Sequence, residues 1–501
     1  MMAYSVLTEP VIPVLWPDGT SSAVGIREAF LRAHEIRDIQ GETPLERYAL
    51  LRLLIAFAMD MLHPKTSYDR RDLLDEGQFD QTVFDRYVSM CEQDGPRFDL
   101  FDPDHPFMQS KYDEKLDAKA EKPVAAIVHS LPSGNNHVFV DHRMANVHEL
   151  SPARAFIAML ASYLFCVSGT AGPSSVNNTP PVYAVMIGNS LFETILVNML
   201  SEKEVGPLPY GCGNVPWRNG RKVLPKEPVA NVSLLEGLTW MPRRITLLPD
   251  ESGAVRRVCC QAGLDFKGNA LWNDPHVPKF KKKDETYGTV KPELARSFWR
   301  DAGTLMYDHD GKTVRQPQAL RCLTNIFDED EMPLQISVRA VGLITNQAAY
   351  TGWTEEMLAI PSSLLTQQEK AERFRKDVSC LETMQAQLSV HVQRYVDKPR
   401  NGSAGKEHEI ATQCQQHFLH GAHDLLFGPA MDEICGSVPD KDHAEHFCEA
   451  VKGLLRDTIS QVLRASGSDA KAMLQQMEAE KWIWISWAKQ TEERMKGYAG
   501  S

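Results

Sequence analysis

The stretch that decides the fold of the C-terminal part is residues 366–397, TQQEKAERFRKDVSCLETMQAQLSVHVQRYVD, which contains no glycine and no proline. Its apolar residues recur every three or four positions and therefore form one continuous stripe along a helix. The stripe consists of Phe374, Val378, Leu381, Met384, Leu388, Val392 and Tyr395. One long amphipathic helix is predicted here.

Three more helices are predicted after this one. They run from about 406 to 426, from 440 to 465 and from 469 to 495, and short loops rich in glycine, proline or serine separate them. Four helices joined by short loops indicate an antiparallel four-helix bundle. We place the domain boundary near residues 360–366, which gives a first domain at 1–362 and a bundle at 363–501.

The first domain mixes strand and helix patterns. Residues 5–16 have an extended pattern, and Pro17-Asp18-Gly19 is typical of a hairpin turn. Residues 228–300 have a β-rich pattern. Helices are predicted at 43–62, 79–93, 151–167 and 189–201, the first capped by Thr43 and the third by Ser151. The expected fold class is α+β, a large mixed α/β N-terminal domain followed by the four-helix bundle.

Composition limits the function classes. The chain has 501 residues, 43% hydrophobic and 24% charged, which is typical of a globular protein of two or three domains. No window approaches the ~18 apolar residues of a membrane span, and residues 1–10 do not resemble a secretory signal. The ten cysteines are scattered. A cytoplasmic protein with reduced thiols and no membrane partner is therefore expected.

The net charge of −12 argues against indiscriminate nucleic-acid binding, because lysine and arginine contacts to phosphates dominate non-specific affinity. Two local basic runs remain, at 217–222 and at 279–283. The second contains Lys281, Lys282 and Lys283. These runs are either solvated loops or contacts to DNA.

Two loops and one lysine are candidates for base contacts. The apolar run ending at Ile344 has strand length, and Gly352 marks a turn, so Asn346 and Gln347 are expected at a loop tip. Their flat amides can bond base edges or enter a base step as a wedge. The loop at 168–181 is rich in small and amide residues, and Lys267 lies between Phe266 and Gly268. The alternatives are a polar loop, a flexible connector and an exposed strand residue.

Catalytic and metal motifs give weak signals. The chain contains no phosphate-binding loop, no Gly-x-Ser-x-Gly elbow and no His-Glu-x-x-His. His309-Asp310 is the ligand type of metal-dependent phosphohydrolases, although a polar turn explains it well. No Cys-x-x-Cys occurs, and Cys259-Cys260 would supply only half a zinc site. Exposed or cap-adjacent positions are expected for five histidines of the bundle: His417, His420, His423, His443 and His446.

Several short stretches, taken together and in order, match one family. The chain resembles the large subunit of Cascade, the type I-E CRISPR surveillance complex (the CasA family). The matching stretches are Ile12-Pro13-Val14, His105-Pro106-Phe107-Met108-Gln109, Asn178-Thr179-Pro180, Gly237-Leu238-Thr239-Trp240-Met241-Pro242, Leu271-Trp272 with Pro275-His276, Asn346-Gln347-Ala348 and His417-Phe418.

The resemblance implies a subunit without catalytic activity or a cofactor. Its role would be to find the protospacer-adjacent motif (PAM) in double-stranded DNA from the minor groove, to start R-loop formation and to recruit a helicase–nuclease. The other implied partners are the 5′ end of the guide RNA and the backbone, handle-binding and small subunits of the complex. The sequence-based alternatives are a metal-dependent nuclease that uses His309 and Asp310, and a scaffold that binds only proteins.

The same resemblance assigns residues to these contacts. Asn346, Gln347 as the wedge, and Ala348 correspond to one PAM-reading element, and Lys267 to a second. Gly169 and Gly172 belong to the third, a glycine loop at 169–179 that has fewer glycines here than in the family. The loop that meets the guide RNA corresponds to a stretch containing Asn136, His137 and Phe139. No zinc is expected, since residues 141–150 contain no cysteine.

Overall fold

The computed structural model describes residues 3–131, 148–167, 179–206, 211–219, 223–267, 272–293, 296–309, 311, 313–327, 331–346, 349–397 and 408–498. The chain forms two compact units. The first comprises residues 1–298 and 311–362, and the second residues 299–310 and 363–501. The second unit therefore begins at Ser363 and also takes in residues 299–310, which the sequence analysis assigned to the first domain.

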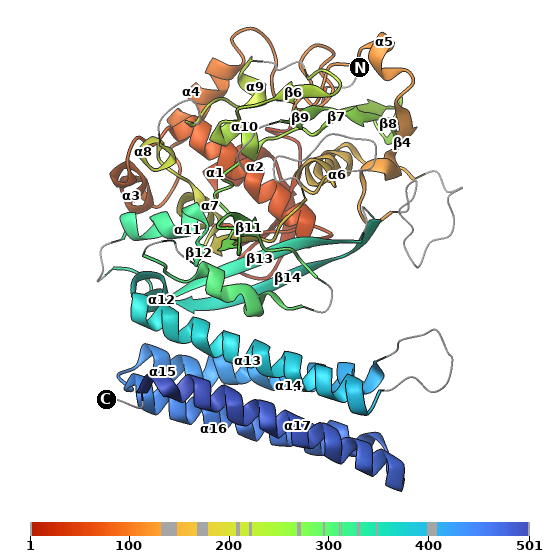
Figure 1. The fold of residues 1–501 in the computed structure, drawn as a ribbon. Coiled ribbons are helices and arrows are strands. Elements are labelled where there is room, and N and C mark those ends of the chain that lie inside the picture. Colours follow the sequence, from red (N-terminus) through yellow and green to blue (C-terminus); the bar gives the residue numbers. More distant parts are fainter. Residues whose placement is uncertain are drawn as a thin grey trace. The chain divides into compact units, whose positions relative to one another are not determined.

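The first unit alternates helices and strands, as the mixed pattern of its sequence predicts (Figure 1). Its helices are α1 (Ile26–Leu31), α2 (Pro44–Leu62), α3 (Ser67–Glu76), α4 (Gln81–Cys91), α5 (Glu114–Asp117), α6 (Pro152–Leu164), α7 (Leu191–Asn198), α8 (Glu202–Val205), α9 (Pro216–Asn219), α10 (Leu234–Leu238) and α11 (Gln318–Arg321). The predicted caps of two of them are present. The Thr43 hydroxyl accepts a hydrogen bond from the Glu46 N–H, and the Ser151 hydroxyl accepts one from Arg154.

The strands of this unit form small separate sheets. The strands are β1 (Ile12–Leu15), β2 (Ser21–Val24), β3 (Asp38–Ile39), β4 (Glu121–Pro123), β5 (Tyr183–Ile187), β6 (Glu227–Val229), β7 (Arg243–Pro249), β8 (Val255–Ala262), β9 (Leu264–Phe266), β10 (Lys279–Lys281), β11 (Tyr287–Thr289), β12 (Val314–Arg315), β13 (Gln335–Asn346) and β14 (Ala349–Pro361). Their orders are β2-β1-β3, β4-β8-β7, β11-β10-β12, β14-β13-β5 and β6-β9. The turn predicted at 17–19 joins the antiparallel pair β1 and β2.

Helix α2 is the centre of the core, and its residues are buried on nearly every side (Figure 1). The Arg52 guanidinium on α2 is fully buried and bonds the Asp274 carboxylate at 2.8 Å and the carbonyl oxygens of Gly237 and Leu238. A larger residue would not fit at Gly237, because the Trp272 ring occupies the space that a side chain would need. The family-like stretch 237–242 therefore meets, at one buried ion pair, the residue Asp274 that stands between the family-like Trp272 and Pro275-His276, and both stretches serve the fold.

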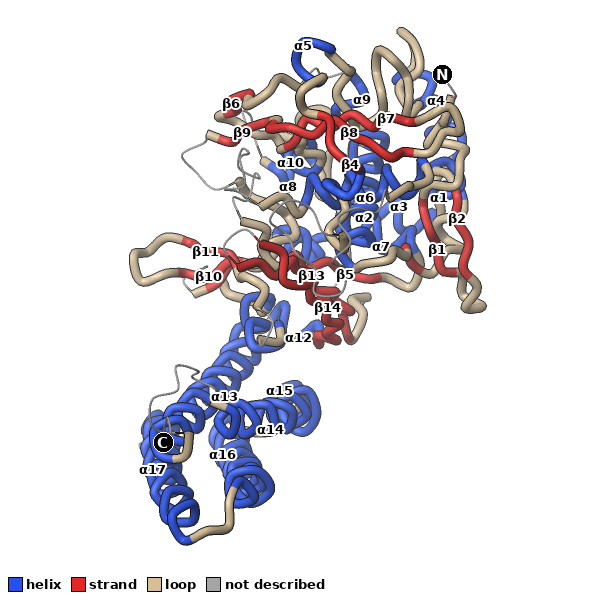
Figure 2. Tube along the Cα trace, turned by 90° about the vertical axis from the view of Figure 1, so that its right-hand side faces the viewer, coloured by secondary structure: helices blue, strands red, loops and turns tan. Residues whose placement is uncertain are grey.

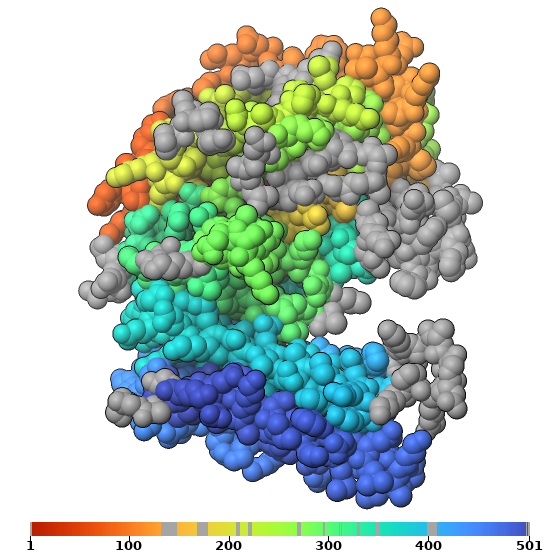
Figure 3. Space-filling model, in the orientation of Figure 1, coloured from red at the N-terminus to blue at the C-terminus, as the bar shows by residue number. Residues whose placement is uncertain are grey.

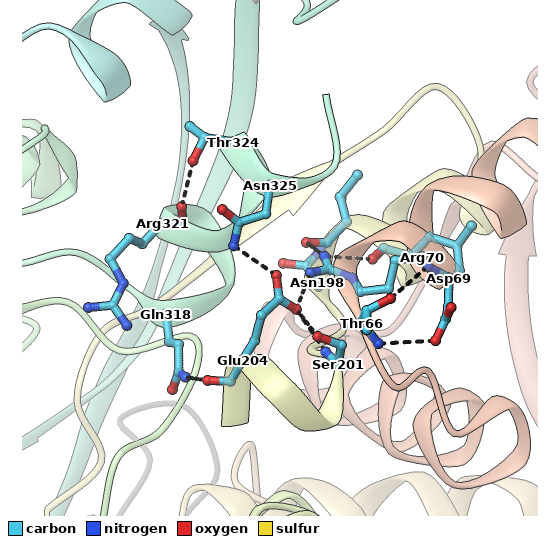
Figure 4. A network of polar contacts seen from close by, with 12 residues as sticks. Thr66, Asp69, Arg70, Asn198, Ser201, Glu204, Gln318, Arg321, Thr324 and Asn325 are labelled. Atoms are coloured by element: carbon cyan, nitrogen blue, oxygen red, sulfur yellow. Dashed lines mark hydrogen bonds and ion pairs between the residues drawn. The ribbon is translucent and has the colours of Figure 1, made fainter. Parts of the chain in front are cut away.

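A second buried arginine, Arg70, links several helices of this unit. Figure 4 shows Arg70 of α3 reaching the Glu204 carboxylate of α8, and the two charged groups are 2.7 Å apart. Arg70 also donates to the carbonyl oxygen of Leu196 in α7, and Glu204 accepts from Ser201 and from Asn325. A buried charge is tolerated when it is paired and hydrogen-bonded in this way. The network joins α3, α7 and α8 to the segment that follows α11.

The second unit consists of helices, including those that the sequence predicts. They are α13 (Gln368–Tyr395), α14 (Glu409–Leu425), α15 (Met431–Cys435), α16 (Asp440–Thr458) and α17 (Ala470–Met495), and the short α12 (Ser362–Thr366) precedes them. Helix α13 packs against α14 and α17, and α16 packs against the same two helices. Residues 299–310 belong to this unit because the Arg300 guanidinium bonds Glu382 and the Arg375 guanidinium bonds the Tyr307 carbonyl, with Glu382 and Arg375 both on α13.

One histidine of this unit is cap-adjacent, as one of the two expectations had it, and is also buried. His443 lies in the first turn of α16, with its side chain 1% exposed, and its two ring nitrogens lie 2.9 Å from Asp377 and 3.0 Å from Glu433. Asp377 also pairs with Arg494 of α17. Burial opposes the charged imidazole, but the hydrogen bonds to Asp377 and Glu433 outweigh it and raise the pKa of His443. His446, one turn later, is exposed as expected.

Candidate nucleic-acid interface

The candidate wedge stretch, Asn346-Gln347-Ala348, stands in the sequence where β13 ends and β14 is about to begin. These two strands form the longest strand pair of the described chain (Figure 1). Strands β13 and β14 pair from Gln335 opposite Pro361 to Asn346 opposite Ala349. Residues 347 and 348 connect this last pair. Gln347 and Ala348 lie outside the described residues, and of Asn346 only the backbone is described. The strand pair therefore carries these three positions at the end of a hairpin.

The strand register changes close to this end. It shifts between Ile344 and Thr345, and the Thr351 hydroxyl donates to the Ile344 carbonyl at 3.2 Å. Such a bulge increases the local twist and re-aims the residues beyond it. The turn predicted at Gly352 is wrong, because Gly352 lies within β14 opposite Ile344. The connection occurs earlier, at 347–348, since β14 pairs along its whole length.

Strand β5 brings a second candidate segment toward the same end. It runs antiparallel to β13, with Ile187 opposite Ser337 and Tyr183 opposite Val341. The chain that precedes Tyr183 therefore approaches the Asn346 end of β13. That preceding segment is 168–178, and its Gly169 and Gly172 lie outside the described residues.

A ring cluster, His129–Phe165–Tyr350, joins the bases of three candidate segments. The rings of His129 and Tyr350 have centroids 4.9 Å apart, and those of His129 and Phe165 are 6.3 Å apart. His129 lies just before segment 132–147, Phe165 just before 168–178, and Tyr350 just after 347–348. Asn136, His137 and Phe139 lie in the first of these segments, outside the described residues. The described flanks of all three segments thus meet at one place.

The two titratable rings of this cluster, His129 and Tyr350, are uncharged at neutral pH. Burial lowers the pKa of His129 to about 4 and raises that of Tyr350 to about 12, so both rings are neutral at pH 7. The nearby cation is Arg243, at the start of β7, which bonds the thiol of Cys166 beside Phe165. Tyr350, His129 and Arg243 were not predicted as site residues from the sequence. The available signal was that Tyr350 directly follows the wedge stretch.

Lys267 lies directly after β9. Its ammonium group pairs with the Asp265 carboxylate at 2.8 Å, and its side chain is 63% exposed. The preceding Phe266 packs edge-on against Trp240, with ring centroids 6.5 Å apart. Within the described part of the chain, none of these contacts reaches the ring cluster. The structure therefore leaves Lys267 at the surface and does not bring it together with Tyr350.

The basic run lies on a hairpin formed by β10 and β11. Figure 2 shows this hairpin projecting from the first unit, and in Figure 3 its bright green residues lie at the surface. Lys282 and Lys283 are exposed. Lys281 is half-buried and pairs with Glu285. Two of the three candidate lysines therefore present their charge to solvent.

The alternative metal sites find little support in the geometry. His309 Nδ1 lies 3.1 Å from the Tyr307 hydroxyl, and Asp310 lies outside the described residues. Cys259 and Cys260 are buried in β8, and burial raises the pKa of Cys259 to about 12, which keeps its thiol protonated at neutral pH. The described residues contain no group of three or more His, Cys, Asp or Glu side chains arranged to hold a metal ion.

No helix in the described part of the chain is both long enough and apolar enough to cross a membrane.

Comparison with known proteins gives consistent matches. The family model described as CRISPR-associated protein Cse1 matches residues 6–481. The CRISPR-associated protein CasA/Cse1 of Thermus thermophilus is 28% identical over 421 residues, which cover 81% of this chain and 80% of that protein.

Solved structures share the fold. The crystal structure of Thermus thermophilus CasA has a TM-score of 0.78 at 23% identity, covering 97% of this chain and 100% of that one. Thermobifida fusca Cse1 has a TM-score of 0.76 at 20% identity, covering 98% of both chains. A chain from a structure described as a CRISPR RNA-guided surveillance complex has a TM-score of 0.75 at 17% identity, covering 97% of this chain and 100% of that one.

Proposed function

The chain belongs to the Cse1 family of CRISPR-associated proteins, and on that premise we propose that it is the large, non-catalytic subunit of a type I-E CRISPR RNA-guided surveillance complex. It reads the PAM of double-stranded target DNA from the minor groove and opens the duplex there. The observation that carries this proposal is that the described flanks of the three candidate segments meet at the ring cluster, His129–Phe165–Tyr350.

The wedge is assigned to Gln347, with Asn346 and Ala348 beside it at the end of the β13–β14 hairpin. A paired hairpin with a bulge holds its connecting residues on a rigid stem, so binding DNA costs little ordering of the stem. Opening one base step costs roughly a few kcal/mol, which groove contacts can offset. The minor groove shows a degenerate donor and acceptor pattern, so this reader tolerates several flanking sequences. Base pairing with the guide RNA then supplies target specificity.

The other candidate residues act around this wedge. Gly169 and Gly172 line the groove from the segment that precedes β5. Lys267 contacts a base edge or a phosphate away from the ring cluster, with which the structure does not bring it together. Asn136, His137 and Phe139 meet the 5′ end of the guide RNA. The described flanks of this segment and of the wedge are adjacent, because the rings of His129 and Tyr350 touch.

The remaining partners bind elsewhere on the chain. The second unit, whose helices α13, α14, α16 and α17 pack in pairs as in a four-helix bundle, binds other subunits of the complex. The chain also helps to recruit the helicase–nuclease after the duplex is opened. The proposed site of action is the cytoplasm.

The test is to separate duplex opening from first contact. A complex assembled with the Gln347→Ala chain is compared with wild type, using a duplex that carries a fluorescent base analogue beside the PAM. Initial binding is expected to change less than the rate of opening, because wedging follows groove docking. The matched control is Gln335→Ala, an exposed glutamine at the far end of β13, the strand that leads to Gln347. Equal loss of both steps, or an equal effect of the control, would contradict the proposal.

A further inference from the structure

The first unit contains a cavity of about 380 Å³ that the proposed function does not use. It is lined by the 105–109 stretch, by the loop at 94–97 and by the start of α9. This volume falls within the range of roughly 300–1,000 Å³ typical of small-molecule pockets. The His-Pro-Phe-Met-Gln stretch therefore forms the wall of a space that is large enough for an organic ligand.

Arg97 lines this cavity without a protein partner. The residue is only 8% exposed, and its Nε and Nη1 are buried and bond no acceptor in the described part of the chain. Other buried arginines of the same unit are paired, Arg52 with Asp274 and Arg244 with Asp117. An unpaired buried guanidinium is costly, and buried polar groups are normally satisfied. Both unpaired donors have almost no accessible surface, so the Arg97 side chain has to turn toward the cavity before a ligand can accept hydrogen bonds from them.

Two of the three acidic residues that line the cavity, Asp102 and Asp104, are engaged elsewhere, and the third is Asp94. One Asp102 oxygen accepts the N–H groups of Asp104 and His105 and so closes the turn at 102–105. Asp104 pairs with Lys111. These carboxylates disfavour a ligand with several negative charges but leave the Arg97 fork open. A planar guanidinium fork matches the two oxygens of a carboxylate or a phosphate.

We propose that this cavity binds a small organic molecule through one oxyanion group, a carboxylate or a phosphate, anchored by the Arg97 guanidinium. The remainder of the ligand lies against Pro106 and the ring edges of Phe107 and Trp217, which line the same cavity. A free phosphate ion alone would leave most of the volume unfilled.

Calorimetric titration of the full chain tests this site with benzoate and phenyl phosphate as probes. Both carry the same ring, so the one that binds identifies the oxyanion. Benzyl alcohol is the uncharged control. At least one anion is expected to bind with one-to-one stoichiometry, and benzyl alcohol is not. Binding of neither anion, or equal binding of the alcohol, overturns the proposal.

Variants assign the binding to Arg97. Arg97→Met is expected to weaken the anion's affinity at least tenfold. The control Arg257→Met, which alters an exposed arginine paired with Glu121, is expected to leave it unchanged. Arg97→Lys keeps the charge but removes the fork, and we expect it to bind more weakly than wild type. Unchanged affinity in Arg97→Met overturns the proposal.

Thermal melting provides a readout that does not depend on the probes. Without ligand, Arg97→Met is expected to melt at or above the wild-type midpoint, because it removes an unpaired buried charge. The anion that binds is expected to raise the midpoint of wild type only. A clear fall in the midpoint of Arg97→Met would show that the guanidinium has a protein partner, and this result would overturn the proposal. No DNA or other subunit enters these tests.

Discussion

The contact between His129 and Tyr350 gives a prediction that joins structure and function. One ring lies at the base of the guide-RNA segment and the other at the base of the wedge. If this contact positions both segments, its removal should weaken DNA opening even though neither residue is proposed to touch DNA. The perturbations are His129→Ala, Tyr350→Ala and the double variant.

The magnitude follows from the ring geometry. Aromatic pairs with centroids about 4.5–7 Å apart contribute about 0.5–1.5 kcal/mol beyond their buried area, and this pair is 4.9 Å apart. Because about 1.4 kcal/mol corresponds to a factor of ten, the coupling is expected to change duplex opening by about 2- to 13-fold. Both rings are neutral at pH 7, so the coupling should not depend on salt.

The assay is a double-mutant cycle on duplex opening by the assembled complex. Each single variant should slow opening, and the double variant should be less impaired than the sum of the two. The control cycle pairs His129→Ala with Tyr287→Ala, because the Tyr287 ring packs against Arg315 instead. Additive effects in the first cycle, within about 0.3 kcal/mol, would refute a shared platform.

Three further predictions concern stability and salt dependence. Gly237→Ala should lower the unfolding free energy by about 1–3 kcal/mol in denaturant titration, because its new methyl group would lie 2.1 Å from a carbon of the Trp272 indole. The control Gly453→Ala places its methyl group in open space and should raise the unfolding free energy by about 0.5–1 kcal/mol. Equal effects of the two variants would contradict this. Because the pKa of His443 is raised in the folded state, its charged form stabilises the fold below about pH 6.5. The unfolding free energy should therefore fall as the pH rises through the pKa of His443 in the folded protein, and His443→Gln should flatten that fall. A pH dependence of stability that is unchanged in His443→Gln would contradict this. Replacing Lys282 and Lys283 by Gln should reduce the slope of log binding constant against log salt concentration for DNA binding by at most about 1.8. The preference for particular flanking sequences should not change. An unchanged slope would refute contact of these lysines with phosphates.

The helices were predictable because their signals are local. The stretch 366–397 predicts one helix, and the structure has it at Gln368–Tyr395, since an uninterrupted apolar stripe needs only its own sequence. The predicted end of the next helix also agrees. α14 ends at Leu425, and a wider π-helical turn follows at 426–430, where Pro429 cannot donate a hydrogen bond.

The parts of the site that depend on long-range pairing were not predictable. Gly352 looked like a turn residue, but pairing with Ile344 places it inside a strand. The contact between His129 and Tyr350 joins residues more than two hundred positions apart, and no local pattern signals it. His443 can be buried because the carboxylates of Asp377 and Glu433, which lie on other helices, pair with its ring nitrogens. Residues named from the resemblance alone, such as Asn136, remain predictions, and so does Gln347, which the loop pattern also indicates.

The most direct measurement is binding of the guide-RNA complex, assembled with and without this chain, to duplex targets whose flank beside the guide-matched sequence is randomised. The account predicts that the chain confers a flank preference, and that Asn346→Ala and Gln347→Ala abolish it while Gln335→Ala does not. A preference that is absent, or that survives both substitutions, would contradict PAM reading by this hairpin and leave the chain as a protein-binding scaffold.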